Sequence, residues 1–341
     1  MGGARCKHVK WWRRLLPGPS ALATFRMRIL FSAPEAPETE AWFASLAHAL
    51  PGADIRIWQP GDAAPADYGV VWRPPREFFA PRDGLKAVFN LGAGVDAILR
   101  FEREAPGTLP AGVPIVRLED TGMAAQMSEY AAHAVLRYMR RFDEYDLAQR
   151  GGARAWQPLE PHARDSFVVA VLGLGVLGTH VAQTLASFGL PVRGYSRGKK
   201  VLDGIDTYAA DGLDACLAGA RVLVNLLPST PETEGILNRR TFAPLAHGAY
   251  LVNLARGAHL VENDLLEALR EGRIAAATLD VFVQEPLPPD HAFWQEPRIT
   301  ITPHISALTL RDEAVAQIAR KIAAFQHGEP ISGIVDLERG Y

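Results

Sequence analysis

The feature that most constrains the fold is a glycine-rich turn near the centre of the chain, Gly173-Leu174-Gly175-Val176-Leu177-Gly178. It directly follows residues 167–172, a nearly continuous apolar run of the kind found in parallel strands that are covered on both faces. The residues after the turn have the pattern of a helix, so the strand–turn–helix context of a dinucleotide-binding fingerprint is present. The sequence therefore predicts an α/β chain with a doubly wound, Rossmann-type parallel sheet.

The three glycines of this fingerprint have separate roles. Gly173 permits the tight turn, Gly175 lets the backbone approach a pyrophosphate, and Gly178 lets the helix pack closely on the strand. The N–H groups of Val176 and Leu177, at the start of the helix, attract the phosphates. A glycine-rich turn without a ligand is the alternative, but the strand that follows favours a cofactor site.

The end of that next strand indicates which cofactor is preferred. An NAD enzyme usually carries an acidic residue about twenty positions after the fingerprint. Here the position holds Ser196, followed by Arg197, with Lys199 and Lys200 close by. A guanidinium can bind a 2′-phosphate in two places, so NADP is predicted, with NAD as the second choice. A solvated basic turn is the alternative interpretation.

The rest of the chain forms two blocks in which short apolar runs alternate with helical segments, a pattern typical of parallel α/β sheets. The first block contains predicted strands at residues 28–33, 54–58, 68–72, 85–90 and 114–116, and a helix at 37–50. One long amphipathic helix is predicted over 123–149, followed by a surface loop over 150–164. The second block contains predicted strands at 167–172, 191–195, 222–225, 249–253, 274–279 and 298–301, and a helix at 308–326.

Bulk composition excludes several classes of protein. The length of 341 residues suggests two domains, and a hydrophobic content of 48% is enough for their cores. The net charge of −2, from 36 basic and 38 acidic residues, gives no basic surface for nucleic acid. No run of about eighteen apolar residues predicts a membrane span. With Cys6 and Cys216 as its only cysteines, the chain suits a reducing compartment, and a cytoplasmic location is expected.

The first 26 residues differ from the remainder. Basic residues surround Trp11 and Trp12, and Pro17-Gly18-Pro19 follows them. A basic amphipathic membrane anchor is one interpretation. An upstream extension is favoured, because a clean strand begins directly after Met27.

Three side chains that suit hydride-transfer chemistry follow predicted strands of the second block. They are Arg256 in Asn253-Leu254-Ala255-Arg256-Gly257, Glu285 in Gln284-Glu285-Pro286 and His304 in Thr302-Pro303-His304. A fixed cation can hold an anionic substrate and polarise its carbonyl. An imidazole can give or take the proton that hydride transfer leaves unbalanced, and a carboxylate can orient that imidazole. Asp280 is interpreted as a second catalytic carboxylate or as a loop-bracing one, and bracing is favoured.

A glycine-containing loop in the first block is a candidate anion site. Leu91-Gly92-Ala93-Gly94 follows a predicted strand, and its N–H groups can converge on a carboxylate. A plain structural turn explains the loop equally well. Trp42, Trp72 and Trp294 are candidates for the walls of a small pocket, but each suits a core position as well.

At these residues the chain resembles the D-2-hydroxyacid dehydrogenase family, and within it the glyoxylate/hydroxypyruvate reductase A branch. The resemblance covers nearly everything from Met27 to Tyr341. The motifs that carry it are Val71-Trp72-Arg73-Pro74-Pro75, Leu91-Gly92-Ala93-Gly94-Val95-Asp96, Glu119-Asp120-Thr121-Gly122-Met123, the fingerprint, Tyr195-Ser196-Arg197, Asn225-Leu226-Leu227-Pro228, Asn253–Gly257, Leu279–Pro288 and Thr302-Pro303-His304. The block 117–123 and the closing Arg339-Gly340-Tyr341 are specific to the branch.

The resemblance implies two doubly wound parallel-sheet domains. A flavodoxin-like substrate domain is expected over residues 27–122 and 305–341, and a Rossmann nucleotide domain over 123–304. It implies catalytic roles for Arg256, Glu285 and His304, and carboxylate binding by the Leu91–Gly94 loop. Further cofactor contacts are expected at Leu227, Pro228, Ala255 and Asp280.

The expected activity is reduction of glyoxylate and hydroxypyruvate with NADPH by a homodimer, without a metal ion and without nucleic-acid or membrane partners. One alternative is a nucleotide-sensing regulator, because the same fold serves as a corepressor platform in some relatives. Another is a dehydrogenase for a different 2-oxo acid, such as 3-phosphohydroxypyruvate. The complete Arg256, Glu285 and His304 set argues against a regulator without catalysis.

Overall fold

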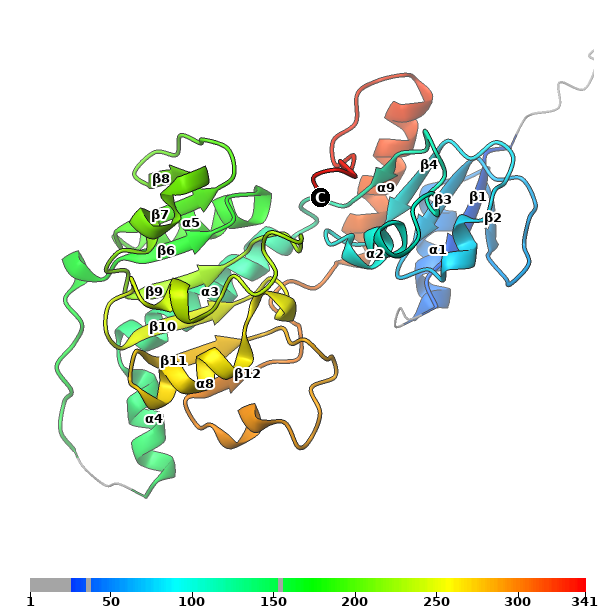
Figure 1. Ribbon diagram of the computed structural model, residues 1–341. Helices are drawn as coiled ribbons and strands as arrows, with labels where there is room; N and C mark the ends of the chain where they lie inside the picture. The colour runs from blue at the N-terminus through cyan, green and yellow to red at the C-terminus, as the bar shows by residue number, and fades with distance from the viewer. Residues whose placement is uncertain (1–25, 35–37, 153–155) are drawn as a thin grey trace, which may run out of the picture.

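The computed structural model describes residues 26–34, 38–152 and 156–341. All but the last residue of the predicted N-terminal extension therefore lies outside the described residues. Two β-sheets of parallel strands lie side by side, each with helices on both faces (Figure 1). This confirms the predicted fold class of two doubly wound α/β units.

The smaller sheet has five strands in the order β2-β1-β3-β4-β5, which is the flavodoxin-like order. Its strands are β1 (Arg28–Ser32), β2 (Asp54–Ile57), β3 (Tyr68–Val71), β4 (Ala87–Asn90) and β5 (Ile115–Val116). Helices α1 (Thr39–Ala49) and α9 (Arg311–Gln326) cover one face, and α2 (Asp96–Glu104) covers the other. Ile29 and Phe31 of β1 face α1 and α9, whereas Leu30 faces α2, as the two-residue period of a strand requires.

The larger sheet has seven strands in the order β12-β11-β10-β9-β6-β7-β8. Its strands are β6 (Val169–Leu172), β7 (Val192–Ser196), β8 (Asp206–Ala209), β9 (Val222–Asn225), β10 (Ala249–Asn253), β11 (Ile274–Leu279) and β12 (Ile299–Ile301). From β6 the chain builds outward through β7 and β8, then returns to the other side of β6 through β9. The carboxyl end of β6 is therefore the point where the strand order reverses, which is where such sheets bind ligands.

Helices pack on both faces of the larger sheet. Helices α3 (Met123–Met139) and α5 (Val176–Ser187) cover one face, and α6 (Leu213–Leu217), α7 (Arg239–Phe242) and α8 (Glu262–Arg270) cover the other. Short 3₁₀ turns connect several elements: η1 (Arg76–Phe79), η2 (Arg164–Ser166), η3 (Ala210–Gly212), η4 (Gly257–His259) and η5 (Ala292–Gln295).

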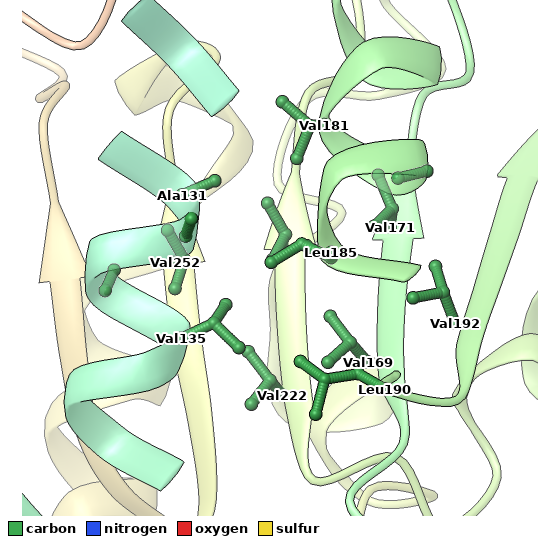
Figure 2. Close-up of a cluster of buried hydrophobic side chains, with 14 of the residues drawn as sticks. Ala131, Val135, Val169, Val171, Val181, Leu185, Leu190, Val192, Val222 and Val252 are labelled. Atoms are coloured by element: carbon green, nitrogen blue, oxygen red, sulfur yellow. The ribbon is translucent and has the colours of Figure 1, made fainter. Parts of the chain in front are cut away.

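The apolar run that precedes the fingerprint is buried on both sides. Val169 and Val171 of β6 pack under α3 and α5, and Ala170 and Leu172 face the opposite helices. Figure 2 shows the first of these clusters, with Ala131, Val135, Val181, Leu185, Val222 and Val252 among its members. Complete burial of a valine or leucine side chain contributes roughly 1.5–3 kcal/mol, so this cluster fixes the position of the turn after β6.

The single helix predicted over residues 123–149 is wrong. The chain forms α3 up to Met139 and a separate helix α4 (Phe142–Arg150). Arg141, between them, has a left-handed φ of 58°, and its guanidinium binds the Glu144 carboxylate at 2.6 Å. A second ion pair, Arg137 to Asp146 at 2.6 Å, spans the break. Neither glycine nor proline marks this break in the sequence, so the apolar pattern continues across it without a signal.

All of the predicted strands are confirmed to within two residues at either end. Strand β8 was not predicted; it is short and only partly buried, with no apolar run. In residues 26–34, 38–152 and 156–341, no helix is both long enough and apolar enough to span a membrane.

Candidate active site

A cavity of about 520 Å³ lies between the two sheets. Its walls come from the segments after β4, β5, β6, β7, β8, β9 and β10, from Met127 and from the last two residues of the chain. Many of the residues predicted to bind cofactor or substrate line it: Ala93, Gly94, Gly173, Gly175, Val176, Leu177, Gly178, Ser196, Arg197, Leu227, Pro228, Ala255 and Arg256. The cavity therefore brings the glycine-rich fingerprint of the larger sheet together with Ala93 and Gly94, in the loop of the smaller sheet.

The glycine-rich turn places the N-terminus of α5 at this cavity. Gly173 has a φ of 97°, which only glycine adopts without strain. A Cβ atom on Gly178 would lie 1.8 Å from the carbonyl oxygen of Gly173, so no larger residue fits between helix and strand. A Cβ atom on Gly175 would meet nothing within 4 Å, so the backbone there is open to the cavity. The N–H groups of the first helical turn have no partner within the helix and can bind an anion.

The turn after β7 carries the basic residues that were predicted to select the cofactor. The Ser196 hydroxyl donates to the carbonyl of Gly198 at 2.8 Å, which tightens the turn. Arg197 is exposed at the cavity wall, and Lys199 and Lys200 also line the cavity. Glu232, in the loop after β9, also lines the cavity; its pKa is lowered, chiefly by a hydrogen bond with Thr230 and in part by the charge of Arg197.

Arg256 reaches from the larger sheet to the smaller one. Its Nη2 and Nε atoms lie 3.0 and 3.1 Å from Oδ1 of Asp96, and its Nη1 donates to the carbonyl of Ala255 at 2.7 Å. Burial opposes ionisation of Asp96, but the charge of Arg256 and its hydrogen bond outweigh this, so the pKa of Asp96 is lowered. A Cβ atom on Gly94 would lie 1.7 Å from Nη2 of Arg256, so a larger residue there would displace the guanidinium from its present position.

The Leu91–Gly94 loop is held by Asn90, the last residue of β4. The side-chain amide of Asn90 donates to the carbonyls of Gly92 and Gly94 at 2.9 and 2.8 Å. This turns both carbonyls inward, toward Asn90. Leu91 is 2% exposed and belongs to the core, so within the predicted loop only Ala93 and Gly94 line the cavity.

His304 and Glu285 form a direct pair. Nδ1 of His304 lies 2.8 Å from Oε2 of Glu285, and Oε1 of Glu285 accepts from the Phe282 amide at 3.0 Å. Burial acts to raise the pKa of Glu285, but the bonds from His304 and Phe282 and the charge of Arg256 lower it overall. The ionised carboxylate accepts a hydrogen bond from Nδ1–H, which leaves Nε2 as the ring nitrogen that can exchange a proton with a substrate. Neither His304 nor Glu285 lines the cavity itself.

Asp280 braces the loop that carries His304. Its side chain is completely buried, and Oδ1 accepts from the Ile305 amide at 2.8 Å and the Thr302 hydroxyl at 2.6 Å. Its Oδ2 accepts from the Ser306 amide at 2.8 Å, and its carbonyl accepts from the His304 amide at 2.8 Å. His304 has a left-handed φ of 55°, a conformation that such bonds stabilise. Asp280 does not line the cavity, so its position fits bracing and gives no support to cofactor contact.

A buried polar network lies behind Arg256. The side-chain amide of Asn225 bonds to Oδ1 of Asn253 at 3.0 Å and to Nδ1 of His259 at 2.9 Å. His259 Nε2 meets the Pro228 carbonyl at 3.2 Å, and Asn253 donates to the carbonyl of Arg256 at 3.1 Å. The network therefore links the loops after β9 and β10, both of which reach the cavity.

The three tryptophans considered as pocket walls have different surroundings. Trp42 and Trp72 are partly buried against the core of the smaller sheet, and Trp72 lies directly over Gly92. Trp294 is half exposed and lines a different cavity of about 640 Å³, between α3, α4 and β12.

Several lining residues of the central cavity were not assigned to the site by sequence reasoning. Asp96 was named only as part of a motif, and Tyr341 only as a mark of the branch. Thr230, Glu232 and Thr233, in the loop after β9, were not named at all. The acidic residue two positions after Gly94 was the available signal for Asp96.

A family model described as D-isomer specific 2-hydroxyacid dehydrogenase, NAD binding domain, matches residues 132–306. Over 303 residues the chain is 60% identical to a protein named glyoxylate/hydroxypyruvate reductase A from Serratia proteamaculans, covering 89% of this chain and 96% of that protein. A protein of the same name from Yersinia enterocolitica is 55% identical over 305 residues, covering 89% and 97%.

Solved structures of D-isomer specific 2-hydroxyacid dehydrogenases and of a related reductase are also similar to this chain. A D-isomer specific 2-hydroxyacid dehydrogenase from Xanthobacter autotrophicus, in complex with NADPH and MES, has a TM-score of 0.85 and 39% identity, covering 93% of this chain and 100% of its own. The NADPH-dependent glyoxylate/hydroxypyruvate reductase of Sinorhizobium meliloti, in complex with NADP and sulfate, has a TM-score of 0.84 and 35% identity over the same shares.

Proposed function

The chain belongs to the D-isomer specific 2-hydroxyacid dehydrogenase family, and from this premise we propose that it is an NADPH-dependent reductase of glyoxylate and hydroxypyruvate. The products are glycolate and D-glycerate. The observation that carries the proposal is the pair of His304 and Glu285, 2.8 Å apart, with the charge of Arg256 acting on the same carboxylate. A cation, an imidazole and a carboxylate are thus brought together from three separate loops.

The residues at the cavity fit NADP. The open backbone at Gly175 and the first turn of α5 suit the pyrophosphate, and the cavity continues from there to the basic turn at Arg197. The guanidinium of Arg197 would hold a 2′-phosphate through two N–H groups, with Lys199 and Lys200 adding charge. When bound, the reduced nicotinamide supplies a hydride for the carbonyl carbon of the substrate.

Arg256 binds and polarises the substrate in this mechanism. Its contact with Asp96 occupies one edge of the guanidinium and holds its plane in a fixed direction. The remaining N–H groups can meet the substrate carboxylate and the carbonyl oxygen on which negative charge develops. The amides of Ala93 and Gly94 complete the binding of the carboxylate.

His304 provides the proton. With Nδ1 bonded to Glu285, the imidazolium presents Nε2 as the proton donor to the new alkoxide, and the product is a neutral hydroxyl. The negative charge of Glu285 stabilises the imidazolium before transfer, and the ring is left neutral afterwards. Hydride and proton together reduce the 2-oxo acid to the 2-hydroxy acid.

We further propose that residues 27–122 and 305–341 form the substrate domain and residues 123–304 the nucleotide domain. The return of α9 to the smaller sheet supports this division. Trp156 is fully exposed and Trp294 half exposed on the larger unit, and aromatic surface of this kind supports a homodimer through that unit. The free thiol of Cys216 suits the proposed cytoplasmic location.

The proposal is tested by steady-state turnover of glyoxylate, hydroxypyruvate and 3-phosphohydroxypyruvate, each with NADPH and with NADH. Turnover of the first two acids with a preference for NADPH supports the proposal. Turnover of the phosphorylated acid alone indicates a different dehydrogenase. Binding of NADPH without turnover of any 2-oxo acid indicates a nucleotide-sensing regulator.

A further inference from the structure

Tyr341, the last residue of the sequence, contacts Arg197, which we expect to bind the 2′-phosphate of the cofactor. The ring centre of Tyr341 lies 5.2 Å from Cζ of Arg197. From this contact we propose that Tyr341 is a positioning residue, which holds the Arg197 guanidinium for the 2′-phosphate of NADP and so contributes to cofactor selectivity. The inference rests on the proposed function and extends it to a residue of the other structural unit.

The segment that leads to Tyr341 is attached to the smaller sheet. The Val335 amide donates to the carbonyl of Ile115 at 2.8 Å, and the Arg117 amide donates to the carbonyl of Gly333 at 2.9 Å. Ile334 forms an antiparallel bridge with Val116. The tail therefore runs beside β5, which is an edge strand of the five-stranded sheet.

Beyond the sheet, Asp336 folds the tail into a turn. Its Oδ1 accepts from the amides of Glu338 and Arg339 at 3.0 and 3.1 Å. Its carbonyl accepts from Gly340 at 2.9 Å, and its amide donates to the carbonyl of Tyr341 at 3.2 Å. Chain ends normally fray unless they are tied down in this way. The turn therefore fixes the position of the terminal residue.

This turn places Tyr341 at the boundary between the two sheets. Figure 1 marks the C-terminus there, and Gly340 and Tyr341 line the central cavity together with Ser196, Arg197 and Thr230. Tyr341 is partly buried, whereas residues 336–339 are exposed. A partly buried ring at the end of an otherwise exposed turn indicates a specific contact.

The geometry of a guanidinium explains how the ring would help. An aromatic ring packs on the flat face of the group, while a phosphate binds to the N–H groups on its edge, so both can be bound at once. Arg197 is exposed, and an exposed arginine loses side-chain freedom when it binds a ligand. Contact with Tyr341 removes part of that freedom beforehand, and NADH gains nothing from it because it lacks the 2′-phosphate.

The test is a fluorescence titration of NADPH and of NADH into the full-length protein without substrate. Tyr341→Ala should raise the Kd for NADPH about two- to fivefold, the usual strength of an exposed cation–π contact, and leave the Kd for NADH unchanged. Tyr341→Phe keeps the ring and should match the parent. Leu337→Ala, on the same exposed turn but outside the cavity, is the matched control.

Combination with Arg197→Ala makes the test specific. In that background Tyr341→Ala should have no further effect on NADPH, because the group it positions is gone. An unchanged NADPH Kd in Tyr341→Ala, an equal loss for NADH, or a loss that persists without Arg197 would each overturn the inference. Failure of the unmutated protein to bind NADPH would instead contradict the proposed function.

Discussion

The guanidinium of Arg256 is paired with the carboxylate of Asp96, with Nη2 and Nε 3.0 and 3.1 Å from the same Oδ1 atom. Arg256 follows β10 of the larger sheet, and Asp96 begins α2 beside the smaller one. The pair thus connects the two structural units at the cavity. It holds the cation between the glycine-rich turn after β6 and the Gly94 loop, which is where we propose that the 2-oxo acid binds.

Replacement of Arg256 by lysine should impair both binding and chemistry. Lysine keeps the charge but loses the planar fork that holds Asp96 and the substrate together. Arg256→Lys should lower kcat/KM for glyoxylate by more than about tenfold, or roughly 1.4 kcal/mol of transition-state stabilisation, with the Kd for NADPH unchanged. Arg240→Lys, on α7 and outside the cavity, is the control. If the Arg256 variant matched the parent, Arg256 would be structural, and Arg73 would be the first candidate for the catalytic cation.

Removal of Arg197 should change the cofactor preference. A charge-assisted contact contributes about 1.5–3 kcal/mol, so Arg197→Ala should weaken NADPH binding roughly 10- to 150-fold and hardly change NADH binding. Kd values from cofactor fluorescence would measure this, with Arg240→Ala as the control. An unmutated enzyme that prefers NADH would contradict the assignment of the basic turn to the 2′-phosphate.

Most of the fold could be predicted from the sequence because buried strands appear in it as apolar runs. The apolar run before Gly173 predicts β6, and similar runs predict most of the other strands. Strand β8 lacks this signal because it is a partly buried edge strand. The break at Arg141 lies in the left-handed φ of a single arginine, with ion pairs on either side, and the period of apolar residues does not report either feature.

The site was only partly predictable, because contacts between residues far apart in the chain leave no local pattern in the sequence. Arg256, Glu285 and His304 could be proposed from the sequence because each follows a predicted strand, and the structure pairs His304 with Glu285. The pairing of Arg256 with Asp96 joins positions 160 residues apart, and the contact of Tyr341 with Arg197 depends on how the chain end folds. Neither contact has a local signature in the sequence.

Asp280→Asn separates a bracing role from a cofactor contact. The amide nitrogen of asparagine cannot accept a bond, so at least one donor among Ile305, Ser306 and Thr302 would lose its partner. A buried unpaired donor costs about 1–3 kcal/mol, which should appear as a lower free energy of unfolding in denaturant. Turnover should fall because the His304 loop shifts, while the Kd for NADPH stays the same. A large loss of NADPH affinity with unchanged stability would show a cofactor contact instead.

His259 should make the stability of the protein depend on pH. Burial of the imidazole, together with the charge of Arg256, lowers the pKa of His259 from 6.5 to about 4, although its bond to Pro228 opposes this. Below pH 6.5 the unfolded chain binds a proton that the folded protein does not bind until about pH 4. Stability is therefore lost as the pH falls through this window, by roughly 2 kcal/mol between pH 7.5 and pH 5.

His259→Gln provides the comparison, because the glutamine amide can replace both hydrogen bonds and does not titrate. Guanidinium chloride unfolding at the two pH values should show a smaller pH-dependent loss in this variant than in the parent. Equal losses in the two proteins would mean that His259 is not the group responsible.

The most direct test of the mechanism compares two histidines that each bond to a glutamate. Neither pair lines the central cavity: His304 contacts Glu285 at 2.8 Å, and His291 contacts Glu262 at 3.1 Å. The two pairs differ because the charge of Arg256, a lining residue, acts on Glu285. The measurement is the turnover number for hydroxypyruvate with saturating NADPH in the parent, His304→Ala and His291→Ala. His304→Ala should lose about 10²–10⁴ in turnover, the usual contribution of a general acid, and should still bind NADPH, whereas His291→Ala should stay close to the parent. Near-normal turnover by His304→Ala, or an equal loss in the two variants, would contradict the assignment of His304 as the proton donor.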